Sequence, residues 1–239
     1  MSKIKVHIFH TGKVKVDKAI PLHERNPLAV TGLFRGSDKS MILPVSAYLI
    51  EHPKGYILID SGWHSKYASE KTHRFFGLLD KISPPIIKDG ESIDCQLERI
   101  GVKPSDIRCL YFSHLDFDHT SGAELVKDVQ EFKASKEEIE DANKYFFRYV
   151  KKNWEMISLE SFAYENTGIG PVGKSYDVFG DGSIVLVNTP GHSHGHFSVK
   201  VSGETGYIIL GGDAAYLPES FSKRIIPGLT VDKGLAKNP

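Results

Sequence analysis

Apolar and polar residues alternate in several short segments of the chain, and this pattern predicts β-strands. In residues 3–9, Ile4, Val6 and Ile8 fall on one side, as in a half-buried strand. Two apolar runs, 45–51 and 56–60, flank a short gap containing Pro53 and Gly55, which predicts a hairpin. Four further strands are expected over residues 107–112, 184–188, 197–201 and 207–210.

Helical spacing of apolar residues is found in two segments. In residues 92–100, Ile93, Leu97 and Ile100 lie three and four apart, and Gly101 is expected to end the helix. A longer helix is predicted from about Ser135 to Ser161, because Ser135 and Glu138 have the form of a capping box. Residues 63–90 are expected to form a loop with a short helix, and so long an irregular stretch is uncommon unless it is functional.

Strands and helices are mixed along the chain without a linker-like tract or a fixed repeat. Residues 1–239 are therefore expected to form a single domain with α/β or α+β layers.

Composition excludes several classes of protein. Lys+Arg 30 balances Asp+Glu 30, so the sequence predicts no basic surface for nucleic acid. No apolar run approaches the roughly 20 residues that span a membrane. The first residues lack the apolar core of a signal peptide, and the chain has 2 cysteines and no Asn-x-Ser/Thr acceptor. A cytoplasmic location is the resulting expectation.

The candidate chemistry lies in a cluster of metal-binding residue types that directly follows the strand at 107–112. Four potential ligands occur within six residues: His114, Asp116, Asp118 and His119. Burying two imidazoles and two carboxylates is costly unless a counter-charge is present, and a divalent metal would supply it. A solvated polar loop would be the better interpretation of an isolated His-x-Asp, but a second histidine cluster follows. An EF-hand is excluded, because Lys127 would stand where the bidentate Glu is required.

The second cluster contains His192, His194 and His196 after a Thr-Pro-Gly turn, and a third block places Asp213 after two glycines. In this order the blocks resemble those of the metallo-β-lactamase superfamily, over about residues 40–220. Asp60, in the early Asp-Ser-Gly block, is similar to the family's Asp-x-Gly. The tyrosine three residues after Asp213, and the spacing of the blocks, are most similar to the N-acyl homoserine lactonase branch.

This resemblance implies an α+β fold, an αββα sandwich of two mixed β-sheets flanked by helices. It also implies two divalent metal ions. His114, Asp116 and His192 would hold the first ion, Asp118 and His119 the second, and Asp213 would bridge them. Zinc is the first expectation. Manganese and iron are the alternatives, because Asp116 stands where the commonest motif has histidine and gives a harder ligand set.

The sequence departs from the family in a second respect. Members usually supply a further histidine near the C-terminus, and none follows Asp213 here. Either the chain is truncated at its C-terminus, or the second ion has fewer protein ligands. His194 is a weak substitute, and His196 is expected behind the ligands or in the core.

The implied activity is hydrolysis of a lactone, ester or thioester of a small acyl compound, with quorum quenching as the corresponding role. Two ions would share a water and lower its pKa toward about 7, giving hydroxide for attack on the carbonyl carbon. Tyr216 would stabilise the oxyanion, unless it merely packs over the site, and Asp118 would pass a proton to the leaving group. The aromatic residues Phe34, Phe75, Phe76 and Tyr216 are candidates for an acyl pocket.

Several alternatives were weighed. A non-haem di-iron redox protein and a non-catalytic metal-binding protein of the same fold remain open. Ser193, within Gly-x-Ser-x-Gly, is not expected to be a nucleophile, because no histidine follows Asp213 to complete a triad. Asp60 is expected to orient a ligand histidine, and His64 is a candidate for the pocket lining.

Overall fold

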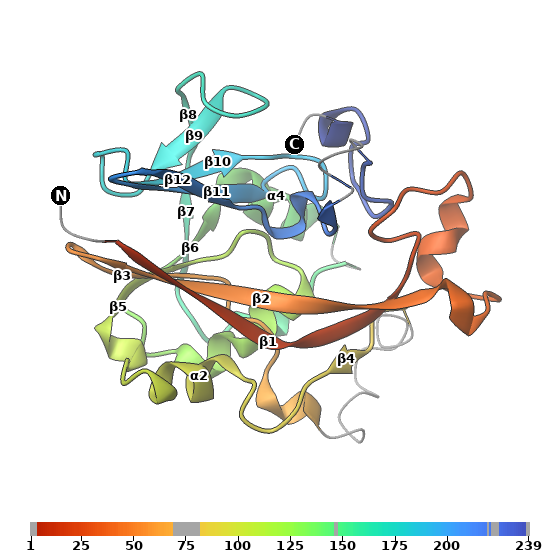
Figure 1. The fold of residues 1–239 in the computed structure, drawn as a ribbon, viewed down its shortest axis with the longest axis horizontal. Coiled ribbons are helices and arrows are strands. Elements are labelled where there is room, and N and C mark those ends of the chain that lie inside the picture. The colour runs from red at the N-terminus through yellow and green to blue at the C-terminus, as the bar shows by residue number, and fades with distance from the viewer. Residues whose placement is uncertain (1–3, 69–81, 146–147, 219, 221–224, 238–239) are drawn as a thin grey trace.

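The computed structural model describes residues 4–68, 82–145, 148–218, 220 and 225–237. Two β-sheets lie face to face, with helices packed outside the larger sheet (Figure 1). The larger sheet has the order β4 (Pro85–Ile86), β1 (Lys5–Asp17), β2 (Ser40–His52), β3 (Gly55–Ile59), β5 (Ile107–Tyr111), β6 (Phe132–Ser135) and β7 (Leu159–Phe162). The smaller sheet has the order β12 (Gly206–Leu210), β11 (Phe197–Gly203), β10 (Ile184–Asn188), β9 (Lys174–Asp177) and β8 (Glu165–Asn166).

Short helices connect these strands. The α-helices among the described residues are α2 (Ile93–Arg99), α3 (Phe117–Thr120) and α4 (Lys136–Lys144). The 3-10 helices are η1 (Pro27–Thr31), η2 (Ser37–Lys39), η3 (Ser65–Ala68), η5 (Pro104–Asp106), η6 (Ser121–Val126), η7 (Lys151–Asn153), η8 (Gly212–Ala214) and η9 (Leu235–Lys237). None of these helices is long and apolar enough to cross a bilayer.

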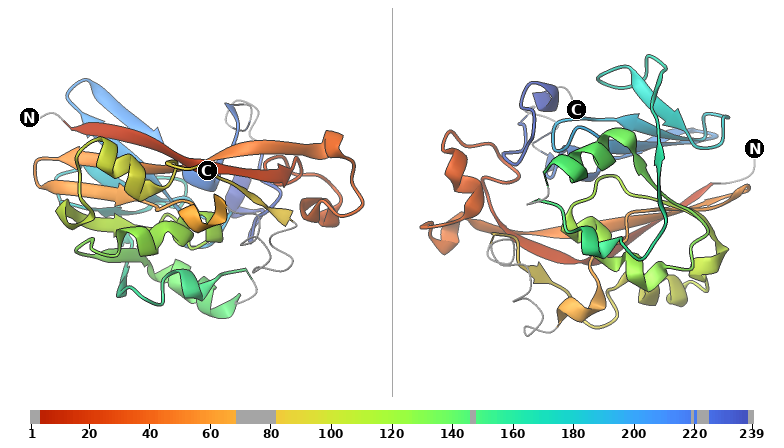
Figure 2. Two further views of the ribbon diagram at one scale, coloured as in Figure 1. Left: turned by 90° about the horizontal axis from the view of Figure 1, so that it is seen from below. Right: turned by 180° about the vertical axis from the view of Figure 1, so that it is seen from behind.

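Each face of the larger sheet has its own hydrophobic core. Leu49, Leu58 and Leu110 point to one face, where they pack with Ile93 and Leu97 of α2. Their neighbours along the same strands point to the other face and pack against β10 and β11 of the smaller sheet. This alternation is the period-2 geometry of strands buried on both faces. The two further views show the resulting layers (Figure 2).

The αββα sandwich predicted from the resemblance is confirmed, with one refinement. The larger sheet is mixed, because β1, β2 and β3 pair antiparallel whereas β3, β5, β6 and β7 pair parallel. The described strands of the smaller sheet pair only antiparallel.

The long helix predicted over residues 135–161 is wrong beyond Lys144. Its start is confirmed, since Ser135 Oγ accepts a hydrogen bond from the Glu138 amide at 3.2 Å. After α4, however, the chain forms η7 and then β7, which pairs in parallel with β6 and buries Phe162 between the sheets. Tertiary pairing has here overridden a local helical spacing.

The irregular stretch predicted at residues 63–90 is irregular in its described parts, which contain η3 and β4. Phe75 and Phe76 lie outside the described residues. Strand β1 continues to Asp17 and β2 begins at Ser40, so both strands are longer than the predicted 3–9 and 45–51. Four loops, those after β3, β5, β10 and β12, then carry the residues of the predicted site.

Candidate metal centre

Two overlapping groups of imidazole and carboxylate donors come together where these four loops meet. The first group consists of His114, Asp116 and His192, and the second of His114, His119 and Asp213. The donor atoms of each group lie within 4.8 Å of one another. Residues separated by about a hundred positions in the sequence therefore converge on one point, as the two-cluster pattern predicted.

Asp213 lies between the two groups and presents one oxygen to each. Its Oδ1 is 3.5 Å from His119 Nε2, and its Oδ2 is 3.8 Å from His114 Nε2 and 3.7 Å from His192 Nε2. Asp118 Oδ2 approaches His119 Nε2 at 3.8 Å. Asp213 thus has an oxygen near each pair of histidine nitrogens, and its bridging of two ions stays a prediction.

Hydrogen bonds on the outer ring nitrogens direct all three histidines inward. His119 Nδ1 lies 2.9 Å from Asp60 Oδ2, and His192 Nδ1 lies 3.1 Å from the carbonyl oxygen of Leu229. His114 Nδ1 lies 3.0 Å from the Ser113 hydroxyl, which itself donates to Asp60. The hydrogen-bond network thus assigns the proton to Nδ1 and leaves each Nε2 facing the carboxylates.

A divalent cation fits this donor set. The His114 side chain is fully buried, and its Nε2 has no hydrogen-bond partner. A buried nitrogen lone pair without a partner is costly, and an ion held also by Asp213 and His119 would satisfy it. Imidazole and carboxylate are ligands of zinc and of the other first-row divalent metals.

Electrostatics within the site favour positive charge between the carboxylates. Burial opposes it, yet the carboxylates of Asp60, Asp213 and Asp118 raise the pKa of His119 well above its ordinary value. Burial, together with the neighbouring Asp213 and Asp116, raises the pKa of Asp118 to about 6. Burial is also the main reason that the pKa of His114 lies well below its ordinary value.

Asp60 organises this region in the way that the sequence predicted. It follows β3 with a φ of 60°, a left-handed conformation that is uncommon outside glycine. In that position its carboxylate accepts hydrogen bonds from the Ser113 amide and hydroxyl, both at 2.7 Å, as well as contacting His119. Backbone strain of this kind persists where the surroundings over-determine it.

Two residues of the site were not predicted to belong to it. The sequence assigned Glu138 only to a helix cap, and Arg148 carries no motif. Glu138 is fully buried and accepts from the Leu115 amide at 2.8 Å and from the Ser193 hydroxyl at 2.5 Å, so it joins the two histidine-bearing loops. Arg148 forms an ion pair with both oxygens of Asp116, each at 2.6 Å. A largely buried carboxylate such as Asp116 requires a positively charged partner. This requirement was the only sign in the sequence that a residue such as Arg148 would lie beside it.

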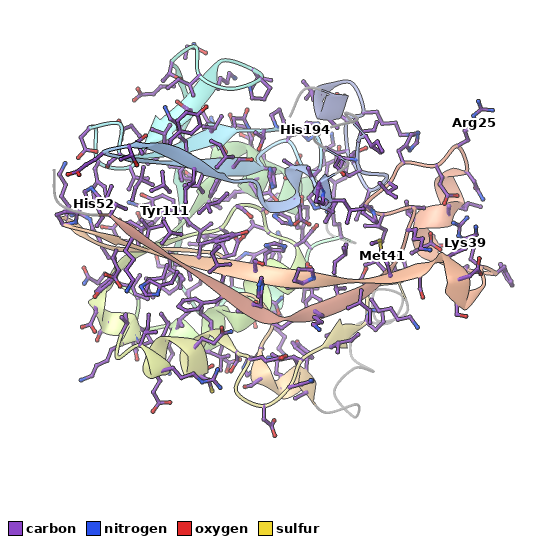
Figure 3. The ribbon with its side chains drawn as sticks, in the orientation of Figure 1. Arg25, Lys39, Met41, His52, Tyr111 and His194 are labelled. Carbon is purple, nitrogen blue, oxygen red and sulfur yellow. The ribbon has the colours of Figure 1, made fainter. Side chains whose placement is uncertain are left out.

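The remaining histidines of the second cluster lie outside the donor groups. His194, labelled in Figure 3, is 39% exposed and pairs with Asp141 at 2.8 Å, so it is not a substitute ligand. His196 is buried, and its Nε2 accepts from the Asp213 amide at 3.1 Å, as expected for a residue behind the ligands. Ser193 is buried and donates to Glu138, in agreement with its rejection as a nucleophile.

A cavity of about 660 Å³ opens onto the donor groups. Tyr216 lines it, with its hydroxyl donating to Asp213 Oδ2 at 2.8 Å. The rest of the lining is largely apolar and includes Val14, Val16, Ile20, Val30, Leu43 and Leu229.

Two expectations for this cavity are wrong. Phe34 is fully exposed at a turn with a φ of 59°, so it does not line the cavity. His64 contacts Glu124 at 3.4 Å and is not part of the cavity lining either.

Comparisons with known proteins agree with the architecture. A family profile described as the metallo-beta-lactamase superfamily matches residues 41–235. An N-acyl homoserine lactonase AttM from Rhizobium johnstonii is 30% identical over 213 residues, which cover 83% of this chain and 76% of the relative. An N-acyl homoserine lactonase from Bacillus cereus is 30% identical, covering 77% of this chain and 68% of the relative.

Among solved structures, an N-acyl homoserine lactone hydrolase with the product N-hexanoyl-L-homoserine bound at its catalytic metal centre has a TM-score of 0.78. It is 26% identical, and the match covers 99% of this chain and 85% of that one. The chain belongs to the metallo-β-lactamase superfamily. Within that superfamily, its fold and donor set are those of a metal-dependent hydrolase.

Proposed function

We propose that this protein hydrolyses the ester bond of acyl lactones, with N-acyl homoserine lactones as the first substrates to test. The observation that carries this proposal is the position of an apolar cavity next to inward-facing imidazole and carboxylate donors. The lactonase names of its relatives favour hydrolysis over the redox alternative.

Two divalent ions, with zinc as the first expectation, would be held by His114, Asp116, His192, Asp118, His119 and Asp213. Such ions polarise a carbonyl group and make a water nucleophilic near neutral pH. The buried and outwardly hydrogen-bonded histidines provide a rigid frame for them.

Tyr216 and Asp118 are proposed as the catalytic side chains. The Tyr216 hydroxyl already points at the donor groups and would donate to the carbonyl oxygen as negative charge develops there. Asp118, which lies beside His119 at the donor groups, would pass a proton to the leaving alkoxide of the opened ring. We further propose that the protein acts in the cytoplasm on a freely diffusing small molecule.

The first test is turnover of N-acyl homoserine lactones, followed by ring opening at constant pH. Chelation followed by desalting is expected to abolish hydrolysis, and added zinc or manganese should restore it. If the metal-restored protein turns over neither lactones nor simple esters, the proposed substrate class is wrong.

The apolar wall is expected to select the acyl chain. Leu43 faces the cavity from β2, while its neighbour Ile42 points outward and is 55% exposed. Leu43→Trp should lower kcat/KM for a decanoyl lactone by about tenfold or more, because each excluded CH₂ forfeits about 0.8 kcal/mol of burial. The butanoyl lactone should be nearly unaffected.

Ile42→Trp is the matched control for that variant, since it adds the same side chain on the opposite face of the same strand. It should leave the profile of rate against acyl length unchanged. An equal loss for short and long chains in Leu43→Trp would contradict the placement of the acyl group along this wall.

A further inference from the structure

The guanidinium group of Arg148 lies at the first donor group, in contact with Asp116 and His192. Its Nε and Nη2 donate to the two oxygens of Asp116, and its Nη1 donates to the carbonyl oxygen of His192 at 2.8 Å. Nη2 also lies 2.9 Å from His192 Nε2. Four of the five guanidinium N–H groups therefore have partners at this site.

The atoms that Arg148 contacts are the ones that an ion in the first position would need. Asp116 Oδ2 and His192 Nε2 are only 2.9 Å apart. Because the His192 proton is assigned to Nδ1 by the contact with Leu229, these two atoms are both acceptors. Two acceptors so close together are stabilised by a shared donor, and Nη2 of Arg148 contacts both.

The second position has no comparable side chain. Among the residues that the structure describes, the recorded ion pairs of Asp118 and Asp213 are with histidines, and none is with lysine or arginine. The two positions therefore differ in whether an arginine already contacts the donor atoms that an ion would need. At the first, a divalent ion must displace a guanidinium, which cannot lose its proton. At the second, it meets carboxylates paired with histidines, and an imidazole can release its proton and bind the ion through the freed nitrogen.

We propose that Arg148 is a built-in competitor for the first metal ion, so that the protein binds one divalent ion tightly and a second ion much more weakly. The inference rests on the two ion positions of the proposed function, but not on the identity of the substrate. It also accounts for Asp116 in this chain: a carboxylate can pair with a guanidinium, whereas the histidine of the commonest motif cannot.

A direct role for Arg148 in holding substrate is less consistent with its contacts. Its side chain is 14% exposed, and a single N–H remains for any additional acceptor. A substrate oxygen would have to replace an ion pair that fixes both ends of the Asp116 carboxylate. The geometry therefore favours competition for the ion over recognition of the ligand.

The test is a zinc titration of the full chain after chelation and desalting. A chromophoric chelator competes for the zinc, and elemental analysis gives the number of ions bound per chain. The wild-type protein should retain about one ion per chain against the chelator and take up a second at higher free zinc. Arg148→Met should strengthen the weaker step by about 10- to 100-fold, the value expected for removing charge-assisted hydrogen bonds. Arg148→Lys keeps the positive charge on a shorter side chain, so its affinity for the second ion should lie between those of the wild-type protein and Arg148→Met.

Arg108→Met is the matched control, because Arg108 is exposed at the start of β5, where it lies over the Phe179 ring. It should leave both steps unchanged. Two equal affinities in the wild-type protein would overturn the proposal even if Arg148→Met failed to fold. An unchanged or weakened second step in a folded Arg148→Met would overturn it as well.

The same titration separates this inference from the proposed function. Unequal ion binding without turnover of any lactone would support the role of Arg148 and reject the lactonase proposal. Lactone turnover with two equally tight ions would support the lactonase proposal and reject the role of Arg148. Failure to bind any ion would reject both.

Discussion

Asp213→Asn is expected to lower kcat/KM for an acyl lactone by about 10³-fold, because several kcal/mol of metal-derived transition-state stabilisation would be lost. Asp213 presents one oxygen to His119 and the other to His114 and His192. An amide retains one of these oxygens and turns a hydrogen-bond donor toward the other side. One ion position would then lose its oxygen donor, and the other would keep only a neutral amide oxygen in place of a carboxylate. Bound metal should therefore fall together with activity.

The measurement pairs steady-state kinetics with a metal count on the same preparation. Asp181→Asn serves as the control, since Asp181 forms an exposed pair with Lys54 and belongs to neither donor group. It should keep wild-type turnover and metal content. Near-normal activity in folded Asp213→Asn would show that this carboxylate does not bridge the reacting centre.

Tyr216→Phe is expected to reduce kcat by about 10²-fold, the usual cost of removing one oxyanion donor. The ring would remain in the cavity wall, so KM should change little. The alternative interpretation, in which Tyr216 only packs over the site, predicts nearly unchanged kcat. The oxyanion role and the packing role of Tyr216 therefore predict different values of kcat.

Tyr207→Phe is a suitable control, because Tyr207 is 65% exposed on β12. Both variants lose one phenolic hydroxyl, but only that of Tyr216 contacts Asp213. Metal content should be measured in each, since Tyr216 could otherwise act by supporting Asp213. A loss of bound metal in Tyr216→Phe would contradict an oxyanion role and assign it to positioning.

The parts of the fold that were predictable from the sequence are those with strong local patterns. Strands β3, β5 and β10 are continuous apolar runs bounded by turn residues, and the Ser135 cap marks the start of α4. Strand β7 was missed because its four residues depend on pairing with β6 and carry no period of their own. A helix extending to residue 161 would have placed Arg148 on a helix face instead of beside Asp116.

The donors of the site were predictable because most of them form a compact local motif. His114, Asp116, Asp118 and His119 are adjacent in sequence, and the resemblance supplied their partners His192 and Asp213. Arg148 belongs to no motif and Glu138 only to the helix cap, and their roles in the site arise from contacts 32 and 23 residues away in sequence. The burial argument predicted a divalent metal as the counter-charge of these carboxylates. It did not predict the guanidinium that the structure places beside Asp116.

The buried carboxylate of Glu138 has a consequence for how the molecule is made. It leaves the ribosome well before Ser193, the hydroxyl that satisfies one of its oxygens. Until the segment after β10 has been synthesised, the nascent chain lacks this partner, and an unpaired carboxylate is expensive to bury. The loop holding Leu115 is therefore expected to reach its final position only after that segment has left the ribosome.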